Sequence, residues 1–364
     1  MRSVNAMSDR FLIGFLALSC DRERSGSDLF MFNREADSLS VTLTANLGLD
    51  PRSVYIIVAW KESNLQRSSN ETPGVTAGIK DGLKMKTESR SIGEIEISYV
   101  DAGKGPAVVL IHGHPFDATM WNPQVELLSK SYRVIVPELR GYGRSTMPPN
   151  INETRFDLFG SDILSLLDTL NVETFILGGL SMGGQVVFEI FRQAKQRVQA
   201  LILADTFAGL DSEDVRQLRF VTADRIEKEG MNAYAEEILL KMITPENAKT
   251  FPQLAAHVSN MMRTTSPTGA AAALRGRAKR VDYLPLLDLI SVPTLVVVGR
   301  QDSYTPVSVA QQLHERIRHS SLRIIEDAAH LPNLERSEQF NRVVLAFLRA
   351  LDVEPLAQSA WHAS

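Results

Sequence analysis

Cysteine is nearly absent from this chain of 364 residues, in which Cys20 is the only one. An intrachain disulfide is therefore impossible, and a cysteine-rich metal site cannot hold the fold together. An excess of charge of one sign is also lacking, because 39 basic and 43 acidic side chains leave a formal net charge of −4. This balance gives no electrostatic reason to expect a nucleic acid or an anionic membrane as a partner. One basic cluster is expected on the solvated side of a helix, and it consists of Arg275, Arg277, Lys279 and Arg280.

Long apolar runs are the third absence. No stretch reaches the roughly 18–20 apolar residues that cross a bilayer, so no membrane-spanning segment is expected. Residues 11–20, FLIGFLALSC, come nearest and have the length of a signal-peptide core. Asp9 beside this run, and Ala17 instead of leucine three places before Cys20, argue against a lipoprotein signal. We expect a cytoplasmic protein, with export through this weak signal-like segment as the alternative.

The first 85 residues differ in character from the rest of the chain. They hold short apolar runs, such as 54–60, followed by a polar, linker-like stretch at 62–78. No motif is recognisable in them. Residues 1–85 are therefore expected to be an extension of unknown role that is poorly ordered.

Strands and helices alternate regularly from about residue 90 onwards. After an alternating segment at 91–103, continuous apolar runs typical of buried strands occur at 106–113, 132–139, 174–179, 198–205, 293–299 and 322–327. Helical stretches separate most of them, at 122–130, 156–170, 184–195, 306–318 and 337–350. This order predicts an α/β protein with a doubly wound, mostly parallel sheet that is covered by helices on both faces.

One connection is too long to be a loop. The chain between Asp205 and Pro293 has helical character, which predicts a helical cap at 207–290 inserted into a core made of 86–206 and 291–352. Because ligands bind at the carboxyl ends of the strands in such sheets, this cap is expected to cover the site. Its large apolar side chains are expected to pack in the core of the protein, and none is assigned to a ligand; they are Phe207, Met231, Tyr234, Met242, Met261 and Met262.

The sharpest motif is GGLSMGG at 178–184. It follows one predicted strand and opens a predicted helix, so that Ser181 is the serine of a G-x-S-x-G sequence in the context which that motif requires. Glycines let the backbone pass closely through a strained strand-to-helix turn. Positive potential at the start of the following helix favours negative charge on a reacting oxygen. Ser181 is therefore the candidate nucleophile.

A serine hydroxyl needs a base, and the base needs an anion that holds its tautomer. His330 lies in the loop after the last predicted strand, where a base can reach Ser181. Asp302 follows the strand at 293–299 and gives the chain order Ser, Asp, His. Asp205 also ends a strand and is the alternative acid. Four other histidines are less suited, because His314 and His319 belong to or border a predicted helix, His257 lies in the cap and His362 is near the end of the sequence.

Donors to the oxyanion are predicted in two places. The backbone N–H of Met182 follows the nucleophile, and the main chain of His114 lies in the loop after the strand at 106–113, where Pro115 has no N–H. His112 and His114 with Asp117 suggest a metal site as an alternative. No third histidine accompanies them at the spacing of metal ligands, so no metal is expected.

Five motifs in order resemble the α/β-hydrolase superfamily over residues 88–350. They are HGHPFDATMW, PELRGYGRS, GLSMGG, GRQDSYTP and AAHLPNLERSEQFN. The first and last are similar to those of 3-oxoadipate enol-lactonases and related small esterases. The resemblance implies Ser181 as nucleophile, Asp302 as acid and His330 as base, with His114 and Met182 as oxyanion donors. Glu138 departs from the aspartate usual at its position, and residues 1–85 have no counterpart.

A serine hydrolase that cleaves a small carboxylic ester or lactone without a cofactor is the function expected from these observations. Cofactor-free perhydrolases (haloperoxidases) and carbon–carbon bond hydrolases of the same fold are the alternatives, and a ligand-binding, receptor-like module is a third. Ser181 argues against relatives whose nucleophile is an aspartate.

Overall fold

The computed structural model describes residues 41–47, 54–60 and 86–353. The chain divides into two units, Met1–Gly74 and Val75–Ser364. In the first unit, strands β1 (Val41–Leu47) and β2 (Val54–Trp60) pair antiparallel. A poorly ordered extension is expected at 1–85, and the remaining residues of this range lie outside those that the structure describes.

An eight-stranded sheet forms the centre of the second unit, with strand order β10-β9-β8-β7-β5-β6-β4-β3. Strands β5 to β10 pair parallel with one another, whereas β4 pairs antiparallel with both β6 and β3. The strands are β3 (Thr87–Ile92), β4 (Ile95–Ala102), β5 (Ala107–Ile111), β6 (Arg133–Pro137), β7 (Phe175–Leu180), β8 (Val198–Ala204), β9 (Thr294–Gly299) and β10 (Ser320–Ile325). The predicted apolar strands are confirmed, and the sheet is mostly parallel as expected.

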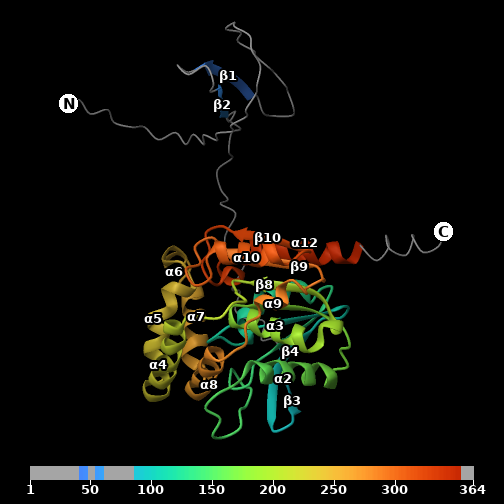
Figure 1. The fold of residues 1–364 in the computed structure, drawn as a ribbon, viewed down its shortest axis with the longest axis vertical. Coiled ribbons are helices and arrows are strands. Elements are labelled where there is room, and N and C mark those ends of the chain that lie inside the picture. The colour runs from blue at the N-terminus through green and yellow to red at the C-terminus, as the bar shows by residue number, and fades with distance from the viewer. Residues whose placement is uncertain (1–40, 48–53, 61–85, 354–364) are drawn as a thin grey trace, which may run out of the picture. The chain divides into compact units, whose positions relative to one another are not determined.

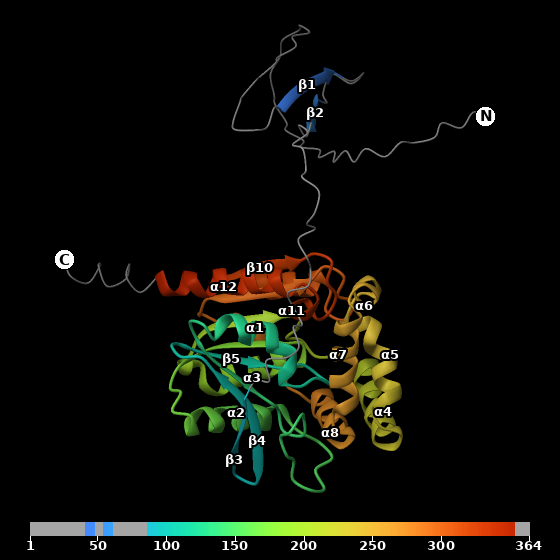
Figure 2. The same cartoon turned by 180° about the vertical axis from the view of Figure 1, so that it is seen from behind.

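Helices cover both faces of the sheet, as Figures 1 and 2 show from opposite sides. Side chains of α2 (Phe156–Thr169), α3 (Met182–Ala194) and α10 (Val307–Arg316) contribute to one apolar core. Side chains of α1 (Asn122–Leu128) and α12 (Ser337–Val353) contribute to a second. Strand β5 serves both, because successive side chains of a strand point to opposite faces: Val109 belongs to the first core and Leu110 to the second.

A helical insertion connects β8 to β9, and both figures show four of its helices, α4, α5, α7 and α8, grouped beside the sheet. It comprises α4 (Glu213–Glu229), α5 (Asn232–Met242), α6 (Pro245–Thr250), α7 (Pro252–Thr264), α8 (Pro267–Ala278) and α9 (Leu284–Leu287). The side-chain oxygens of Ser212, Thr244 and Ser266 accept a backbone N–H at the starts of α4, α6 and α8. Proline in the first turn of α6, α7 and α8 suits a position where no N–H is needed.

The insertion packs into the same apolar core as one face of the sheet. Met242, Met261 and Met262 belong to the core that contains Leu110, and Met231 belongs to a smaller core within the insertion. The expectation that these methionines are core residues is confirmed. In the part of the chain that the structure describes, no helix is both long and apolar enough to cross a membrane.

Candidate active site

Ser181 lies at a sharp turn between β7 and α3. Its backbone angles, φ of 57° and ψ of −118°, fall in a region that residues with a side chain rarely adopt. Such strain costs on the order of 1–3 kcal/mol and persists only where the surroundings impose it. The surroundings here are β8 and its end: the Ser181 N–H donates to the Ala204 carbonyl at 2.9 Å, and the Thr206 hydroxyl donates to the Ser181 carbonyl at 2.7 Å.

The glycines of the motif are required by the space around this turn. A Cβ on Gly179 would lie 2.4 Å from the carbonyl oxygen of Gly183. A Cβ on Gly183 would lie 2.3 Å from the carbonyl oxygen of Ile111. Real Cβ atoms do not approach backbone this closely, so α3 can begin against β5 only with glycine at both positions.

His330 and Asp302 form a buried pair. His330 Nδ1 donates to Asp302 Oδ2 at 2.8 Å. Asp302 also accepts the backbone N–H groups of Tyr304 at 2.8 Å and Thr305 at 3.1 Å, together with the Thr305 hydroxyl. Burial acts to raise the pKa of Asp302, but His330 and Thr305 outweigh it and hold the pKa at about 2. Asp302 is therefore a carboxylate at neutral pH, and it fixes the His330 tautomer that carries hydrogen on Nδ1.

Asp205, the alternative acid, lies in the same cluster. One carboxyl oxygen of Asp205, one of Asp302 and one ring nitrogen of His330 all lie within 4.8 Å of one another. Asp205 Oδ1 accepts the Gly299 N–H at 2.9 Å, whereas its Oδ2 is buried without a hydrogen-bond partner among the described residues. Burial first, and the Asp302 charge second, raise the pKa of Asp205 well above its usual range. The imidazole of His330 donates its hydrogen bond to Asp302 and not to Asp205, which favours Asp302 as the acid.

The nucleophile turn and this cluster meet at the end of β8. Ala204 and Thr206, which flank Asp205, are the two residues that hold the Ser181 backbone. Within the described part of the chain, no hydrogen bond joins the Ser181 hydroxyl to the His330 ring. Ser181, His330 and Asp302 therefore share one end of the sheet, with the His330–Asp302 link formed.

The two predicted oxyanion donors both border Ser181. Met182 is the first residue of α3, so its N–H points out of the helix start without an intrahelical acceptor. The segment that precedes His114 packs directly on the nucleophile, because a Cβ on Gly113 would lie 3.3 Å from Ser181 Cβ. The geometry can thus bring N–H groups from two chain segments to one side of Ser181.

Three tyrosines that sequence reasoning did not assign to the site surround its histidines. The hydroxyl of Tyr142 lies 2.7 Å from His114 Nδ1. The ring centroids of Tyr234 and His114 are 6.0 Å apart, and those of Tyr304 and His330 are 5.3 Å apart. Tyr142 belongs to the PELRGYGRS motif, and this membership could have indicated from the sequence that it lies in the site. Tyr234 comes from α5, so the helical insertion contributes to the site.

His112 does not support the alternative of a metal site. Its Nδ1 donates to the Gly113 carbonyl at 2.9 Å, and its Nε2 accepts the Leu139 N–H at 3.0 Å. Burial lowers the pKa of His112 to about 4, so the ring is neutral and both nitrogens are occupied by backbone. The histidine holds the segment after β5 against the segment after β6.

Glu335 links the His330 loop to the helical insertion, and no sequence motif indicated this role. Its Oε1 accepts the N–H of Ala329, next to His330, at 2.6 Å. Its Oε2 accepts the Thr244 N–H at 2.7 Å and Asn247 Nδ2 at 2.6 Å. Glu335 is the last residue of α11 (Pro332–Glu335), so one buried carboxyl joins α6, α11 and the loop that carries the candidate base.

The expectation that the basic cluster lies on a solvated helix face is wrong. Arg277 is 8% exposed and Arg280 is 6% exposed. Arg275 forms ion pairs with Asp224 and Glu227 of α4, and only Lys279 keeps an exposed side chain. The physical reason is that α8 packs between α4 and the core: a Cβ on Gly276 would lie 1.7 Å from the Thr154 carbonyl oxygen. The helix therefore has little surface left to solvent.

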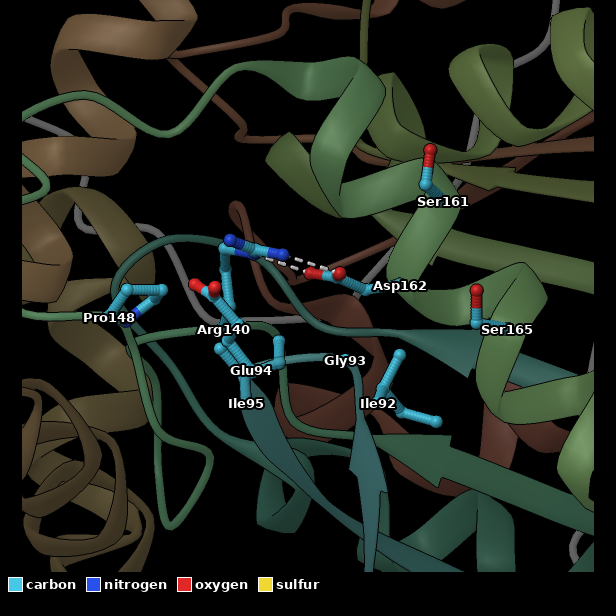
Figure 3. Close-up of a pocket in the computed structure, with 9 residues that line it drawn as sticks. All are labelled: Ile92, Gly93, Glu94, Ile95, Arg140, Pro148, Ser161, Asp162 and Ser165. Atoms are coloured by element: carbon cyan, nitrogen blue, oxygen red, sulfur yellow. Dashed lines mark hydrogen bonds and ion pairs between the residues drawn. The ribbon is translucent and has the colours of Figure 1, made fainter.

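A separate pocket of about 280 Å³ lies between the β3–β4 hairpin, α2 and the segment after β6 (Figure 3). Its lining residues are Ile92, Gly93, Glu94, Ile95, Arg140, Pro148, Ser161, Asp162 and Ser165. Two hydrogen bonds of 2.5 Å join Arg140 to Asp162, so the positive and the negative charge in this pocket neutralise each other. None of the candidate catalytic residues lines this pocket, and it lacks a nucleophile paired with a base.

The family model described as "Alpha/beta hydrolase family" matches residues 108–343, and the chain belongs to this family. It resembles the enol-lactonase-like esterases within it. A thermophilic esterase from Thermogutta terrifontis is 35% identical with a TM-score of 0.70, and the match covers 73% of this chain and 99% of that one. The enol-lactonase from Burkholderia xenovorans LB400 is 28% identical with a TM-score of 0.67, covering 72% of this chain and 100% of that one. The 3-oxoadipate enol-lactonase 2 of Acinetobacter baylyi is 29% identical over 258 residues, 70% of this chain and 94% of its own.

Proposed function

We propose that the protein cleaves a small carboxylic ester or lactone through an acyl-enzyme on Ser181, with His330 as base and Asp302 as its acid partner. The observation that carries the proposal is the 2.8 Å hydrogen bond from His330 Nδ1 to the Asp302 carboxylate. With hydrogen on Nδ1, the lone pair of Nε2 is available, and no hydrogen bond of the described residues uses it. Ser181 occupies the strained turn that exposes a nucleophile in this fold.

The chemistry follows from these roles. His330 Nε2 takes the proton of the Ser181 hydroxyl while Ser181 Oγ attacks the substrate carbonyl carbon. The N–H groups of Met182 and His114 stabilise the oxyanion of the tetrahedral intermediate. His330 gives that proton to the leaving alcohol oxygen as the acyl-enzyme forms, and then takes a proton from the water that attacks the acyl carbon. The same proton passes from His330 to Ser181 Oγ as the bond between Oγ and the acyl carbon breaks, which releases the acid and restores the serine. No metal or redox cofactor has a step in this sequence.

We also propose that residues 207–290 cap the site, between core segments at 86–206 and 291–352. Two contacts support this arrangement. The Thr265 hydroxyl donates to the Pro115 carbonyl at 2.9 Å, and the Tyr234 ring lies against His114. Both contacts reach the loop that carries a proposed oxyanion donor, so the insertion forms a wall of the substrate site.

The named activities of the relatives support the choice of substrate. An enol-lactonase opens a cyclic ester, and an esterase opens an acyclic one. The acyl-enzyme chemistry proposed above suits both substrates, because a lactone differs from an acyclic ester only in retaining its leaving alcohol. The substrate therefore falls in the class of small esters and lactones.

The test is turnover of 4-nitrophenyl butyrate by the wild type and by Ser181→Ala. Wild-type turnover through many cycles is expected, with loss of at least 1,000-fold in the variant, because removal of the nucleophile leaves only binding and the oxyanion donors. Ser161→Ala is the matched control, since this exposed serine of α2 is expected to be dispensable. Full activity of Ser181→Ala would refute the assignment.

A second readout separates ester cleavage from the alternatives on the same fold. Mass spectrometry after treatment with a fluorophosphonate should show one adduct, located on Ser181. Peracid formation from acetate and hydrogen peroxide, or cleavage of a vinylogous diketone, at a rate above that of every ester and lactone tested would identify a perhydrolase or a carbon–carbon bond hydrolase instead. A single slow turnover of every substrate would identify a receptor-like module.

A further inference from the structure

Arg277 is a buried cation without a carboxylate partner in the part of the chain that the structure describes. It lies near the end of α8 and is 8% exposed. Its Nε donates to the side-chain oxygen of Gln185 at 2.9 Å, and its guanidinium lies 5.7 Å from the ring centroid of Phe207. Among the described residues, no ion pair involves it. A charge removed from water without an ion pair costs several kcal/mol, so its retention calls for an explanation.

The carboxylate of Asp211, which lies near Arg277, forms ion pairs with two other arginines. Asp211 receives two hydrogen bonds from Arg219, at 2.8 and 2.9 Å, and one of 3.2 Å from Arg280. Asp211 thus pairs with Arg219 and Arg280, and Arg277 takes part in no ion pair of the described residues. Burial first, and then the charges of Arg219 and Arg280, lower the pKa of Arg277, and the charge of Asp211 offsets this only in part.

Arg277 faces the candidate site through its contacts. Gln185, which holds its Nε, lies one helical turn after Ser181 in α3. The Gln185 amide presents its oxygen to Arg277, and its Nε2 is buried with no hydrogen-bond partner in the described part of the chain. Gln185 Nε2 and the two terminal nitrogens of Arg277 are therefore donors for which the described residues provide no hydrogen-bond acceptor.

The charge of Arg277 shifts the pKa of residues in the candidate site, which agrees with a position of Arg277 beside that site. Burial is the main cause that lowers the pKa of His114, and the charge of Arg277 is the second. The same charge opposes the burial that raises the pKa of Tyr142, Tyr234 and Tyr304. These are the residues around the two histidines of the site, so the guanidinium is close to the space that the substrate enters.

We propose that Arg277 binds a carboxylate of the substrate, assisted by the amide of Gln185, and so selects esters or lactones that carry a second, anionic acid group. The inference rests on the proposed function and deepens it. A planar guanidinium matches a carboxylate with two parallel N–H donors, and Arg277 Nε is the only one of its nitrogens already engaged by a described residue. A substrate carboxylate would complete the charge balance that Asp211 leaves open.

The first experiment compares two esters of matched length, the 4-nitrophenyl half-ester of glutaric acid and neutral 4-nitrophenyl valerate. The wild type is expected to prefer the charged ester in kcat/KM. Arg277→Met should reduce this preference by about 10- to 100-fold, because a charge-assisted hydrogen bond contributes roughly 1.5–3 kcal/mol. Lys279→Met removes the same charge at the exposed surface two residues away and should leave the preference within about twofold. An unchanged preference in Arg277→Met overturns the proposal.

Hydrolysis of the neutral ester depends on the proposed function alone. A protein that cleaves neither ester contradicts the proposed function, whereas one that cleaves both esters without a preference that depends on Arg277 contradicts only the role of Arg277. Arg277→Gln is the second variant if Arg277→Met does not fold, because it removes the charge and keeps a donor toward Gln185. Binding provides a readout that needs no catalysis: glutarate should raise the melting temperature of the wild type and of Lys279→Met, and not that of the Arg277 variants. An equal shift in all four proteins, no shift in any, or a larger shift with inorganic phosphate than with glutarate contradicts a carboxylate site.

Discussion

One carboxyl oxygen of Asp205 and one of Asp302 lie within 4.8 Å of each other, and the pKa values of the two groups are shifted in opposite directions. His330 and Thr305 stabilise the charge on Asp302 and outweigh its burial, which brings its pKa to about 2. Asp205 lacks such partners, so burial and the neighbouring Asp302 charge raise its pKa well above the usual range. The two carboxyl groups of the cluster therefore differ both in their hydrogen-bond partners and in the direction of their pKa shift.

Asparagine substitutions at these positions should separate the two roles in activity. Asp302→Asn is expected to lower kcat for 4-nitrophenyl butyrate by about 1,000- to 10,000-fold, because an amide no longer fixes the His330 tautomer or stabilises the charged imidazole. Asp205→Asn is expected to stay within about tenfold of the wild type, since an amide can still accept the Gly299 N–H and the hydrogen bond from His330 goes to Asp302. Steady-state kinetics of both purified variants decides the assignment. The reverse order of effects would make Asp205 the acid of the triad.

Asp205 should also make the stability of the protein decrease as pH rises. A carboxyl whose folded pKa lies above its unfolded value contributes stability that is present below the unfolded pKa and is lost as pH rises through the folded pKa. Between those two values the free energy of unfolding should fall by up to about 1.4 kcal/mol per pH unit. Asp302 acts in the opposite sense, and its contribution is lost only as pH falls from about 3.8 towards 2. Urea unfolding from pH 5 to 9 should show a shallower slope for Asp205→Asn, and identical slopes would contradict the raised pKa.

Glu335→Gln should destabilise the protein by about 2 kcal/mol. Three N–H donors, from Ala329, Thr244 and Asn247, converge on this carboxyl, and an amide would turn its own NH₂ group toward at least one of them. Chemical denaturation measures the loss. Glu338→Gln is the matched control, because Glu338 is exposed on α12 and its replacement should change stability by less than about 0.5 kcal/mol. Equal effects of the two substitutions would show that Glu335 does not hold the loop.

Two glycine-to-alanine substitutions should differ sharply although both positions lie in helices. At Gly183 the new Cβ would lie 2.3 Å from the Ile111 carbonyl oxygen, which is backbone and cannot yield. At Gly160 of α2 the closest atom, at 2.7 Å, is the flexible end of the Gln193 side chain. Gly183→Ala is expected to cost more than about 3 kcal/mol, and Gly160→Ala less than about 1 kcal/mol. Thermal unfolding of both variants tests this, and a stable, active Gly183→Ala would refute the described packing.

The parts of the fold that could be predicted from the sequence are those that depend on local pattern. The apolar run around Val108 and Val109 indicates a strand because burial on both faces leaves no polar position. Gly179, Ser181 and Gly183 are identifiable because a strained turn restricts the residue types at fixed spacing. His330 and Asp302 follow from their places at strand ends, and the structure joins them by a hydrogen bond.

The unpredicted parts depend on contacts between distant segments. The burial of Arg277 results from packing against Phe207 and Gln185, and the run of alanines in α8 shows no apolar stripe that would assign the arginine to a face. Glu335 gains its role only when α6 is brought to the His330 loop. Burial of a charged side chain is decided by which elements meet, and that information is not local in sequence.

Leu110 of β5 and Val258 of α7 belong to one continuous apolar core. A rigid swing of the inserted helices away from the sheet would expose that core to water, so substrate admission through a hinged door is energetically unfavourable. Substrate entry and product exit instead require local movements of individual side chains and of the short loops at the edge of the inserted helices. Backbone amides of α7 should accordingly exchange their hydrogens with solvent as slowly as those of β5, since both are released only when the whole unit unfolds.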